Sequence, residues 1–260
     1  MMRLPAGIYR LGRLGATGLL DLLLPPACGA CGSPKVAADG LCLDCSRALL
    51  SMVVLPYCPR CGTTQGPNVP IRQDGCWACP TTLNQFDSVV RLGAYHGPLR
   101  SIIRRLKYHR CEQMLRRCCE LLSEAVAARL QAETLDLAMP VPMHWARKAY
   151  RGYDHARAIA HQVAKRLGLP MGDELRRIRY SPPQAQLPRT RRLELVRGAF
   201  SLRSTAAIEG AHVLLIDDVT TTGATANECT RTLLAGGASR VSLAVLAKAE
   251  PPTAYAPQLR

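Results

Sequence analysis

The fold of this 260-residue chain is decided by the stretch Val213-Leu214-Leu215-Ile216-Asp217-Asp218-Val219-Thr220-Thr221-Thr222-Gly223-Ala224-Thr225. Its first four residues are apolar and suit a buried strand of a parallel sheet, and a helix is expected at 225–235. The N–H groups and the dipole at the start of that helix favour an anion, and the threonine hydroxyls add neutral donors. Gly223 lets the backbone approach a ligand closely. The stretch therefore predicts a phosphate-binding loop.

Two carboxylates, Asp217 and Asp218, stand between the strand and the loop. They are poor phosphate ligands, but they suit the 2- and 3-hydroxyls of a ribose, which a carboxylate also binds in dinucleotide folds. Alternatively, either Asp caps a turn, or the threonines form a helix N-cap, but neither explains both features at the carboxyl end of one strand. The chain contains neither G-x-x-x-x-G-K-[ST] nor G-x-G-x-x-G, so the predicted ligand is a ribose 5-phosphate.

Strands and helices alternate along much of the chain. Apolar runs predict strands at 88–95, 135–141 and 241–247, and apolar stripes predict helices at 98–108, 112–132 and 156–167. This alternation favours right-handed crossovers and an α/β fold with a parallel sheet flanked by helices. The basic stretch 171–205 contains several prolines and is expected to be irregular.

Eight of the twelve cysteines form four Cys-x-x-Cys pairs before residue 80. We call Cys28, Cys31, Cys42 and Cys45 the first module, and Cys58, Cys61, Cys76 and Cys79 the second module. Four thiolates in two tight turns suit one tetrahedral zinc ion, so we expect two zinc ions with a structural role. An alternative role is docking of nucleic acid or of a protein partner. A set of disulfides is the least favoured alternative.

The charge of the chain is strongly positive, with a formal net charge of +15 and a pI near 9.7. Between residues 144 and 203 there are 14 Lys and Arg against 4 Asp and Glu. Such a field favours phosphorylated metabolites, nucleic acid or acidic lipid, without choosing among them. The basic stretch is interpreted either as a hood over a polyphosphate or as a solubilising surface.

The first 24 residues predict an amphipathic N-terminal helix. Asp21 interrupts the apolar part, no small-residue cleavage site follows, and the apolar run is short for a membrane span, so neither a signal peptide nor a transmembrane segment is expected. Metal-type cysteine spacing favours a reducing, cytoplasmic compartment. The expected division is a helix at 1–24, a double zinc ribbon at 25–85, a ligand-binding domain at 86–250 and a loose tail at 251–260.

Several motifs together resemble the competence protein F (ComF) family, which is tied to DNA uptake, and the loop itself resembles the fingerprint of type I phosphoribosyltransferases. Three blocks of sequence follow the two cysteine modules. The first block contains Gly97-Pro98-Leu99-Arg100 and Leu106-Lys107-Tyr108, and the second contains Pro140-Val141-Pro142-Met143-His144-Trp145 and Arg151-Gly152-Tyr153. The third block contains Gln184, Leu187, Arg189, Arg192 and Gly198-Ala199-Phe200. The resemblance covers nearly the whole chain. It implies a type I phosphoribosyltransferase fold after a tandem zinc-ribbon module.

The resemblance also implies roles for residues. The acidic pair Asp217 and Asp218 would meet the ribose of Mg-phosphoribosyl diphosphate, with magnesium held mainly by the substrate's own oxygens. The 5-phosphate would bind Thr220, Thr221, Thr222, Gly223, Ala224 and Thr225. The diphosphate would contact Lys107, Arg147, Arg151, Arg189 and Arg192, each of which is otherwise a solvated surface residue.

This chain departs from the family pattern at three positions. Asp154 and His155 replace the usual Asn-Gln pair, and Leu195 replaces an Asn. His155 is interpreted either as an acid or base or as a residue that merely starts a helix, the latter being the more common case. Trp145 is interpreted as a packing residue, with stacking on a base as the alternative.

Two hypotheses follow for the function. The first is a phosphoribosyltransferase in which a nitrogen nucleophile displaces diphosphate from the ribose. The second is a non-enzymatic DNA-handling factor that binds single-stranded DNA, a nucleotide or a competence-machinery ATPase. The positive charge suits both hypotheses.

Overall fold

The computed structural model describes residues 27–66, 75–79, 84–108, 112–130, 134–179 and 194–250. At its centre lies a four-stranded sheet with the strand order β1-β6-β5-β2. These strands are β1 (Val89–Ala94), β6 (Arg240–Lys248), β5 (His212–Thr220) and β2 (Leu137–Pro140). All three neighbouring pairs are parallel, which confirms the predicted parallel sheet.

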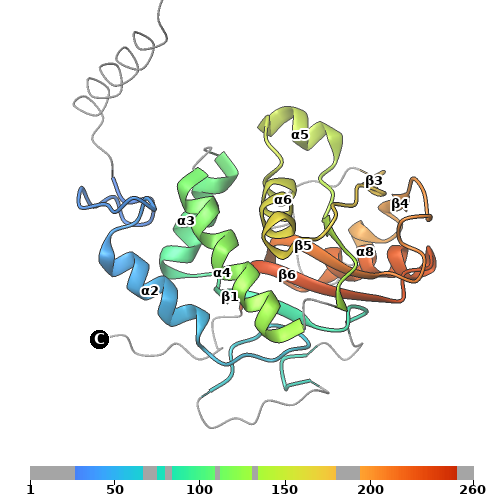
Figure 1. Ribbon diagram of the computed structural model, residues 1–260, viewed down its shortest axis with the longest axis horizontal. Helices are drawn as coiled ribbons and strands as arrows, with labels where there is room; N and C mark the ends of the chain where they lie inside the picture. Colours follow the sequence, from blue (N-terminus) through green and yellow to red (C-terminus); the bar gives the residue numbers. More distant parts are fainter. Residues whose placement is uncertain are drawn as a thin grey trace, which may run out of the picture.

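Helices cover one face of this sheet (Figure 1). They are α3 (Gly97–Tyr108), α4 (Glu112–Leu130) and α6 (His155–Leu167), and each was predicted from its apolar stripe. Their buried side chains pack with Leu214 and Ile216 of β5 in one core cluster. The short helix α5 (Trp145–Arg151) follows β2.

The other face is covered by α8 (Ala224–Ala235) and by a short antiparallel pair of strands, β3 (Leu175–Arg177) and β4 (Phe200–Leu202). Leu175 and Phe200 are buried in a second core cluster together with Val213 and Leu215. The expectation that 171–205 is irregular was therefore wrong at these two strands. Each strand has only three residues, too few for an alternating pattern to be visible in the sequence.

The strand that carries the acidic pair is longer than its apolar run. β5 continues through Asp217 and Asp218 to Thr220, because its pairing with β6 continues to the register pair Thr220 and Lys248. The carbonyl of Thr220 also accepts the N–H of Ala249, at 2.8 Å. The carboxylates therefore belong to a rigid strand and not to the loop that follows it.

The first module shares the core of the larger domain. Helix α2 (Leu43–Val53) follows Cys42, and the buried side chains of Leu41, Leu49 and Met52 join the cluster of α3 and α4. The domain boundaries given above remain predictions, and the segments 1–24 and 251–260 lie outside the described residues. Within the described ranges, the helices are too short or too polar to cross a membrane.

Candidate functional site

The predicted phosphate loop forms one small cavity at the carboxyl end of β5. The cavity has a volume of about 40 Å³, and Asp217 lines it together with all six predicted loop residues: Thr220, Thr221, Thr222, Gly223, Ala224 and Thr225. Gly223 adopts a left-handed conformation with φ of 79° and stands at the N-cap of α8, where it offers no capping side chain. The hydroxyl of Thr222 accepts the N–H of Ala224, the first residue of α8, at 3.3 Å, and the dipole of α8 favours an anion beside this start.

The two carboxylates point to opposite faces of the sheet, since successive residues of a strand alternate. Asp217 lies on the α8 side, where it lines the loop cavity together with Ala226. Asp218 lies on the side of α3 and α6. Only Asp217 shares the cavity with the loop, so the structure separates the pair that the sequence treated as one unit.

Asp218 is held by two side chains from neighbouring helices. Its Oδ2 lies 2.8 Å from Lys107 Nζ and 3.0 Å from His155 Nε2, while its Oδ1 accepts the N–H of Val219 at 2.7 Å. Burial alone would raise the pKa of Asp218, but the hydrogen bond from His155 and the charge of Lys107 hold that pKa well below its usual range. Asp218 is therefore a buried anion.

Asp217 shows the opposite behaviour. Burial, followed by the charge of Asp218, raises the pKa of Asp217 well above its ordinary value. Its Oδ1 accepts the N–H of Asp218 at 2.8 Å. Two adjacent carboxyls with pKa values pushed in opposite directions indicate different roles for each.

Three residues that the sequence singled out make contacts that the sequence did not predict. Lys107, a predicted diphosphate contact, pairs with Asp218. His155 does begin α6, but its buried ring also contacts Asp218, a contact that links residues 63 positions apart and leaves no local signal. Asp154 caps the same helix by accepting the N–H of Arg157 at 3.1 Å.

The remaining predicted diphosphate contacts stay predictions. Arg147 and Arg151 lie in α5, but the structure does not describe their side chains. Arg189 and Arg192 lie outside the described residues.

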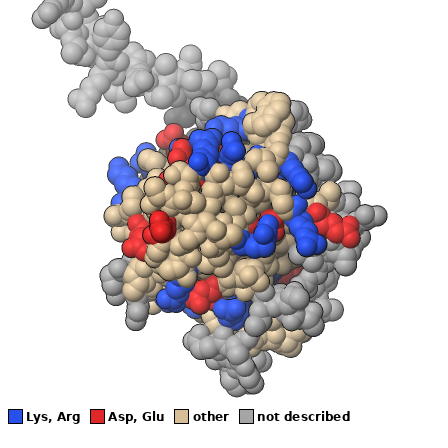
Figure 2. Space-filling view, turned by 90° about the vertical axis from the view of Figure 1, so that its right-hand side faces the viewer, with Lys and Arg blue, Asp and Glu red and all other residues tan. Residues whose placement is uncertain are grey.

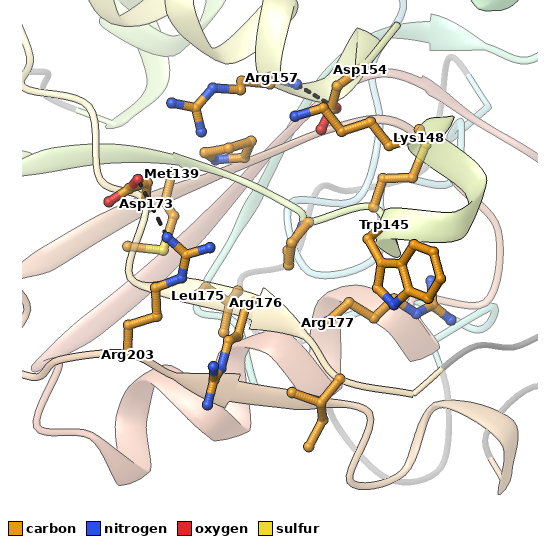
Figure 3. Close-up of a pocket in the computed structure, with 14 residues that line it drawn as sticks. Met139, Trp145, Lys148, Asp154, Arg157, Asp173, Leu175, Arg176, Arg177 and Arg203 are labelled. Carbon is orange, nitrogen blue, oxygen red and sulfur yellow. Dashed lines mark hydrogen bonds and ion pairs between the residues drawn. The ribbon is translucent and has the colours of Figure 1, made fainter. Parts of the chain in front are cut away.

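A second, larger cavity of about 430 Å³ lies between α5, α6 and the β3–β4 pair (Figure 3). Its basic lining includes Lys148, Arg157, Arg176 and Arg203. Trp145 stands at its edge with 74% of its surface exposed, so the expected packing role was wrong. The sequence showed the positive charge of this region, but not that an exposed indole lies among the cations.

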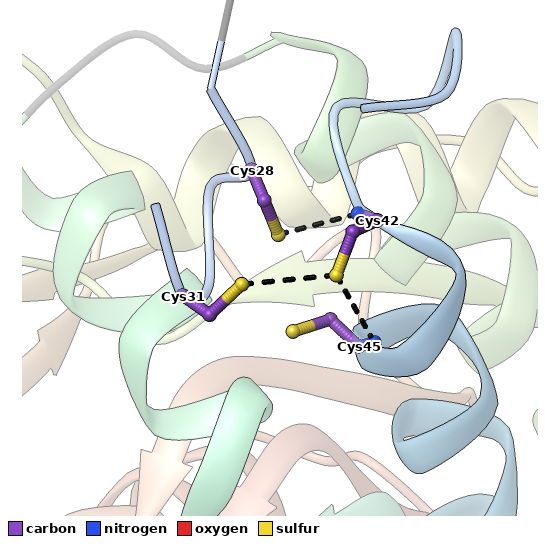
Figure 4. A group of neighbouring side chains, drawn as sticks. All are labelled: Cys28, Cys31, Cys42 and Cys45. Carbon is purple, nitrogen blue, oxygen red and sulfur yellow. Dashed lines mark hydrogen bonds between the residues drawn. The ribbon is translucent and has the colours of Figure 1, made fainter. Parts of the chain in front are cut away.

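The two cysteine modules each gather four sulfurs within 4.8 Å of one another, and the described cysteines are free thiols. Figure 4 shows the four converging side chains of the first module. The distances from Cys31 Sγ to Cys42 Sγ and from Cys58 Sγ to Cys79 Sγ are both 3.7 Å. Sulfurs at the corners of a zinc tetrahedron with bonds of about 2.3 Å lie about 3.8 Å apart. Backbone N–H groups also point at the sulfurs, as from Cys42 to Cys28 at 3.2 Å. Both modules suit structural zinc.

Comparison with known proteins agrees with this architecture. Residues 19–83 match the family described as "Double zinc ribbon domain", and residues 154–258 match "Phosphoribosyl transferase domain". Competence protein F of Haemophilus influenzae is 30% identical over 223 residues, covering 84% of this chain and 94% of the relative. DNA utilization protein YhgH of Salmonella typhi is 28% identical over 229 residues, covering 85% and 96%.

Among solved structures, a purine phosphoribosyltransferase from Pyrococcus horikoshii is similar at 18% identity, with a TM-score of 0.35 and coverage of 55% of this chain and 80% of that one. The two domain matches, the parallel sheet and the paired sulfur clusters confirm the predicted fold class. It is a type I phosphoribosyltransferase fold preceded by a tandem zinc-ribbon module.

Proposed function

The chain belongs to the competence protein F family, and we propose that it binds Mg-phosphoribosyl diphosphate at the carboxyl end of β5 and transfers the phosphoribosyl group. One observation carries this proposal. The loop threonines, the start of α8 and Asp217 line one cavity, so donors for a 5-phosphate lie beside a group suited to ribose hydroxyls.

In the proposed reaction a nitrogen nucleophile forms a bond to C1 of the ribose while the bond from C1 to the diphosphate oxygen breaks. The electron pair of that bond leaves with the diphosphate. Asp217 orients the ribose from the loop cavity, and Asp218 acts from the opposite face by fixing Lys107 and His155 at the edge of the sheet. Because Lys107 is paired with Asp218, neutralising the departing charge falls mainly to Arg147, Arg151, Arg189 and Arg192.

Magnesium would reach this site with the substrate and be held mainly by the substrate's oxygens, where it would screen the diphosphate charge. We also infer a reducing, cytoplasmic compartment, since the described cysteines are free thiols and eight of them are arranged for metal.

Calorimetry with Mg-phosphoribosyl diphosphate tests the first function. We expect saturable binding that weakens about twofold to tenfold in Asp217→Asn, because one hydrogen bond to a ribose hydroxyl is worth about 0.5 to 1.5 kcal/mol. Asp218→Asn should also bind more weakly, since Lys107 and His155 lose their anchor. Glu120→Gln, an exposed carboxylate on α4, serves as the matched control. Absence of saturable binding to the unaltered chain contradicts the proposal.

The larger cavity favours a second candidate function, binding of single-stranded DNA in DNA uptake. Asp154 and Asp173 also line this cavity, but the cations outnumber them, so the exposed indole can stack on a base while nearby cations contact phosphates. On the β3–β4 side of the molecule, Lys and Arg side chains lie in several groups around an area without charged side chains, and acidic side chains lie between some of these groups (Figure 2). In this function the zinc ribbons would dock a partner such as a competence-machinery ATPase.

Titration of a labelled single-stranded oligonucleotide distinguishes this function. Trp145→Ala should weaken binding about 5- to 100-fold, since stacking on one base is worth about 1 to 3 kcal/mol. Trp77→Ala, an equally exposed tryptophan of the second module, should leave affinity within about twofold under the same principle. The logarithm of the affinity should fall steeply with the logarithm of the salt concentration. Equal losses in both variants would contradict a site at Trp145.

A further inference from the structure

The turn between Cys58 and Cys61 is joined directly to the segment that precedes β1. The carbonyl of Arg60, inside this turn, accepts a hydrogen bond from Asn84 Nδ2 at 2.8 Å, and Arg60 Nη2 donates to the carbonyl of Asn84 at 3.3 Å. The carbonyl of Pro59 accepts the N–H of Val89 at 2.7 Å. Arg60 Nη1 also donates a hydrogen bond to the carbonyl of Asp87, so several hydrogen bonds fix the second module to residues 84–89.

The same Asn84 reaches the phosphate loop. Its Oδ1 accepts a hydrogen bond from Asn227 Nδ2 at 3.1 Å, and Asn227 Oδ1 accepts the N–H of Gln85 at 2.9 Å. The N–H of Asn227 donates to the carbonyl of Gly223 at 2.8 Å, which is the first turn of α8. A Cβ added to Gly223 would lie only 3.3 Å from Asn84 Oδ1. Asn84 thus touches the turn of the second module, the first turn of α8 and the glycine of the loop.

A second contact runs through β6. Lys248 Nζ donates a hydrogen bond to the carbonyl of Thr221 in the loop. The Cβ of Lys248 lies 3.7 Å from the position of a Cβ on Gly62, which follows Cys61 in the second module. The second module therefore reaches the phosphate loop along two routes, one through Asn84 and one through Lys248.

The first module makes no comparable connection. Its nearest partner outside its own segment is the start of α4, where Met114 lies against Gly29 and Gln113 lies near Gly40. Among the residues that the structure describes, no hydrogen bond joins the first module to residues 219–228.

From this asymmetry we propose that Asn84 and Asn227 are positioning residues through which the second module holds the phosphate loop in its binding shape. Zinc in the second module and a phosphate group in the loop are then coupled, because each stabilises the same arrangement of Arg60, Asn84 and Asn227. Such coupling is reciprocal: whatever zinc adds to ligand affinity, the ligand adds to zinc affinity. The ligand part of this inference rests on the proposed function.

Amide hydrogen exchange of the full chain tests the positioning without any ligand. In Cys76→Ser, which removes a thiolate of the second module, amides of residues 221–227 should exchange about tenfold faster or more, as local opening becomes easier. In Cys31→Ser, the corresponding change in the first module, they should accelerate no more than the amides of the central strands, because that variant lowers overall stability without loosening the loop itself. Acceleration of the loop beyond that of the central strands in both variants, or in neither variant, overturns the positioning.

Asn84→Ala and Asn227→Ala give the same test should the cysteine variants not fold. Both variants keep all eight zinc-type ligands, so they should retain about two zinc ions per chain while loop exchange accelerates. Gln113→Ala, beside the first module, is the matched control and should leave loop exchange unchanged. Unchanged loop exchange in both Asn variants overturns the role of these two residues.

Release of zinc to a zinc-selective chelator tests the coupling. Saturating Mg-phosphoribosyl diphosphate should slow release from the second module about fivefold or more, leave the first module unaffected, and lose this effect in Asn227→Ala. Ligand binding that changes neither release rate overturns the coupling and leaves the proposed function intact. Absence of ligand binding overturns both the coupling and the proposed function. The positioning role of Asn84 and Asn227 is tested separately, by the amide hydrogen exchange experiment without ligand.

Discussion

The two cysteine modules have nearly the same sequence pattern, yet they attach to the rest of the chain by opposite chemistry. The first module docks through apolar side chains: Leu41, Leu49 and Met52 enter the core between α3, α4 and the sheet. The second module docks through polar groups around Arg91, which is 1% exposed in the middle of β1. The same metal-binding motif therefore extends the hydrophobic core in the first module, whereas in the second module it is attached beside the edge of the sheet that carries the phosphate loop.

The polar attachment is a compact network. Glu250 Oε1 accepts the N–H and the hydroxyl of Thr64, both at 2.7 Å, and the same hydroxyl lies 2.6 Å from Arg91 Nη2. Arg91 Nη2 also lies 3.7 Å from Glu250 Oε1, and the Arg91 guanidinium lies 4.8 Å from the ring centre of Tyr57. Because this arrangement has a buried charge at its centre, it tolerates the loss of a partner less well than an apolar contact of similar size.

The largest expected loss of stability follows when the first module loses a zinc ligand and detaches from the core. Cys31→Ser should lower the free energy of unfolding by about 5 kcal/mol, because three buried apolar side chains of this module lose their attachment at about 1.5 to 3 kcal/mol each. Cys76→Ser removes the corresponding type of ligand from the second module, which places fewer side chains in the core, so the loss should be smaller. Urea denaturation gives both values, and a larger loss in Cys76→Ser would reverse the comparison.

A smaller loss should follow when the polar network is broken. Glu250→Gln leaves the Arg91 charge buried without its carboxylate and should cost about 3 kcal/mol, as for other buried pairs that lose one partner. Glu112→Gln breaks an exposed pair with Arg116 and should cost less than about 0.5 kcal/mol. Thermal or urea denaturation of both variants measures the difference, and similar losses would show that the second module does not depend on Arg91.

The sequence predicted what depends on local pattern. The four Cys-x-x-Cys pairs, the alternation of strands and helices and the loop after Asp218 all lie within short windows, and the structure places them as expected. The buried face of a helix and a Cys-x-x-Cys turn that binds metal can both be predicted from neighbouring residues alone.

What the sequence could not predict depends on distant partners. Glu250 meets Thr64 across 186 positions, and Asn227 meets Asn84 across 143. Glu and Asn residues are usually solvated on protein surfaces, so the sequence alone does not show that Glu250 and Asn227 make these contacts. The separation of Asp217 from Asp218 was missed for a different reason, since the strand continues past its apolar residues only because β6 continues beside it.

The pH dependence of stability tests the buried cluster of Asp218, Lys107 and His155. A carboxyl with a lowered pKa adds stability above its unfolded pKa of about 3.9, and that stability is lost as the pH falls below this value. Conversely, Asp218 raises the pKa of Lys107 in spite of burial, so the contribution of Lys107 is complete below about pH 10 and is lost as the pH rises above it.

Asp218→Asn should therefore lower stability at neutral pH by about 2 kcal/mol and flatten the fall of stability between about pH 4 and pH 2. Denaturation at a series of pH values measures this slope. Glu112→Gln, which breaks only an exposed pair, should keep the slope of the unaltered chain, because the Lys107–Asp218–His155 cluster is intact. An unchanged acid slope in Asp218→Asn would show that another carboxyl dominates acid unfolding.

The smallest expected effect isolates the contact between the second module and the loop. Gly223 and Gly210 both have positive φ, 79° and 72°, so alanine at either position should cost about 1 kcal/mol of backbone strain. A Cβ at Gly210 meets open space, whereas a Cβ at Gly223 must displace Asn84 Oδ1 by a few tenths of an ångström. The two variants should thus share the same backbone strain, but only Gly223→Ala should also loosen the hydrogen bonds of Asn84 to Asn227 and Arg60. Release of zinc from the second module should accelerate about twofold to fivefold in Gly223→Ala and remain unchanged in Gly210→Ala, since a hydrogen bond is worth about 0.5 to 1.5 kcal/mol.

Equal release rates in both variants would mean that Asn84 moves away from the added methyl group without disturbing the turn at Arg60. The second module would then resemble the first module in being independent of the phosphate loop.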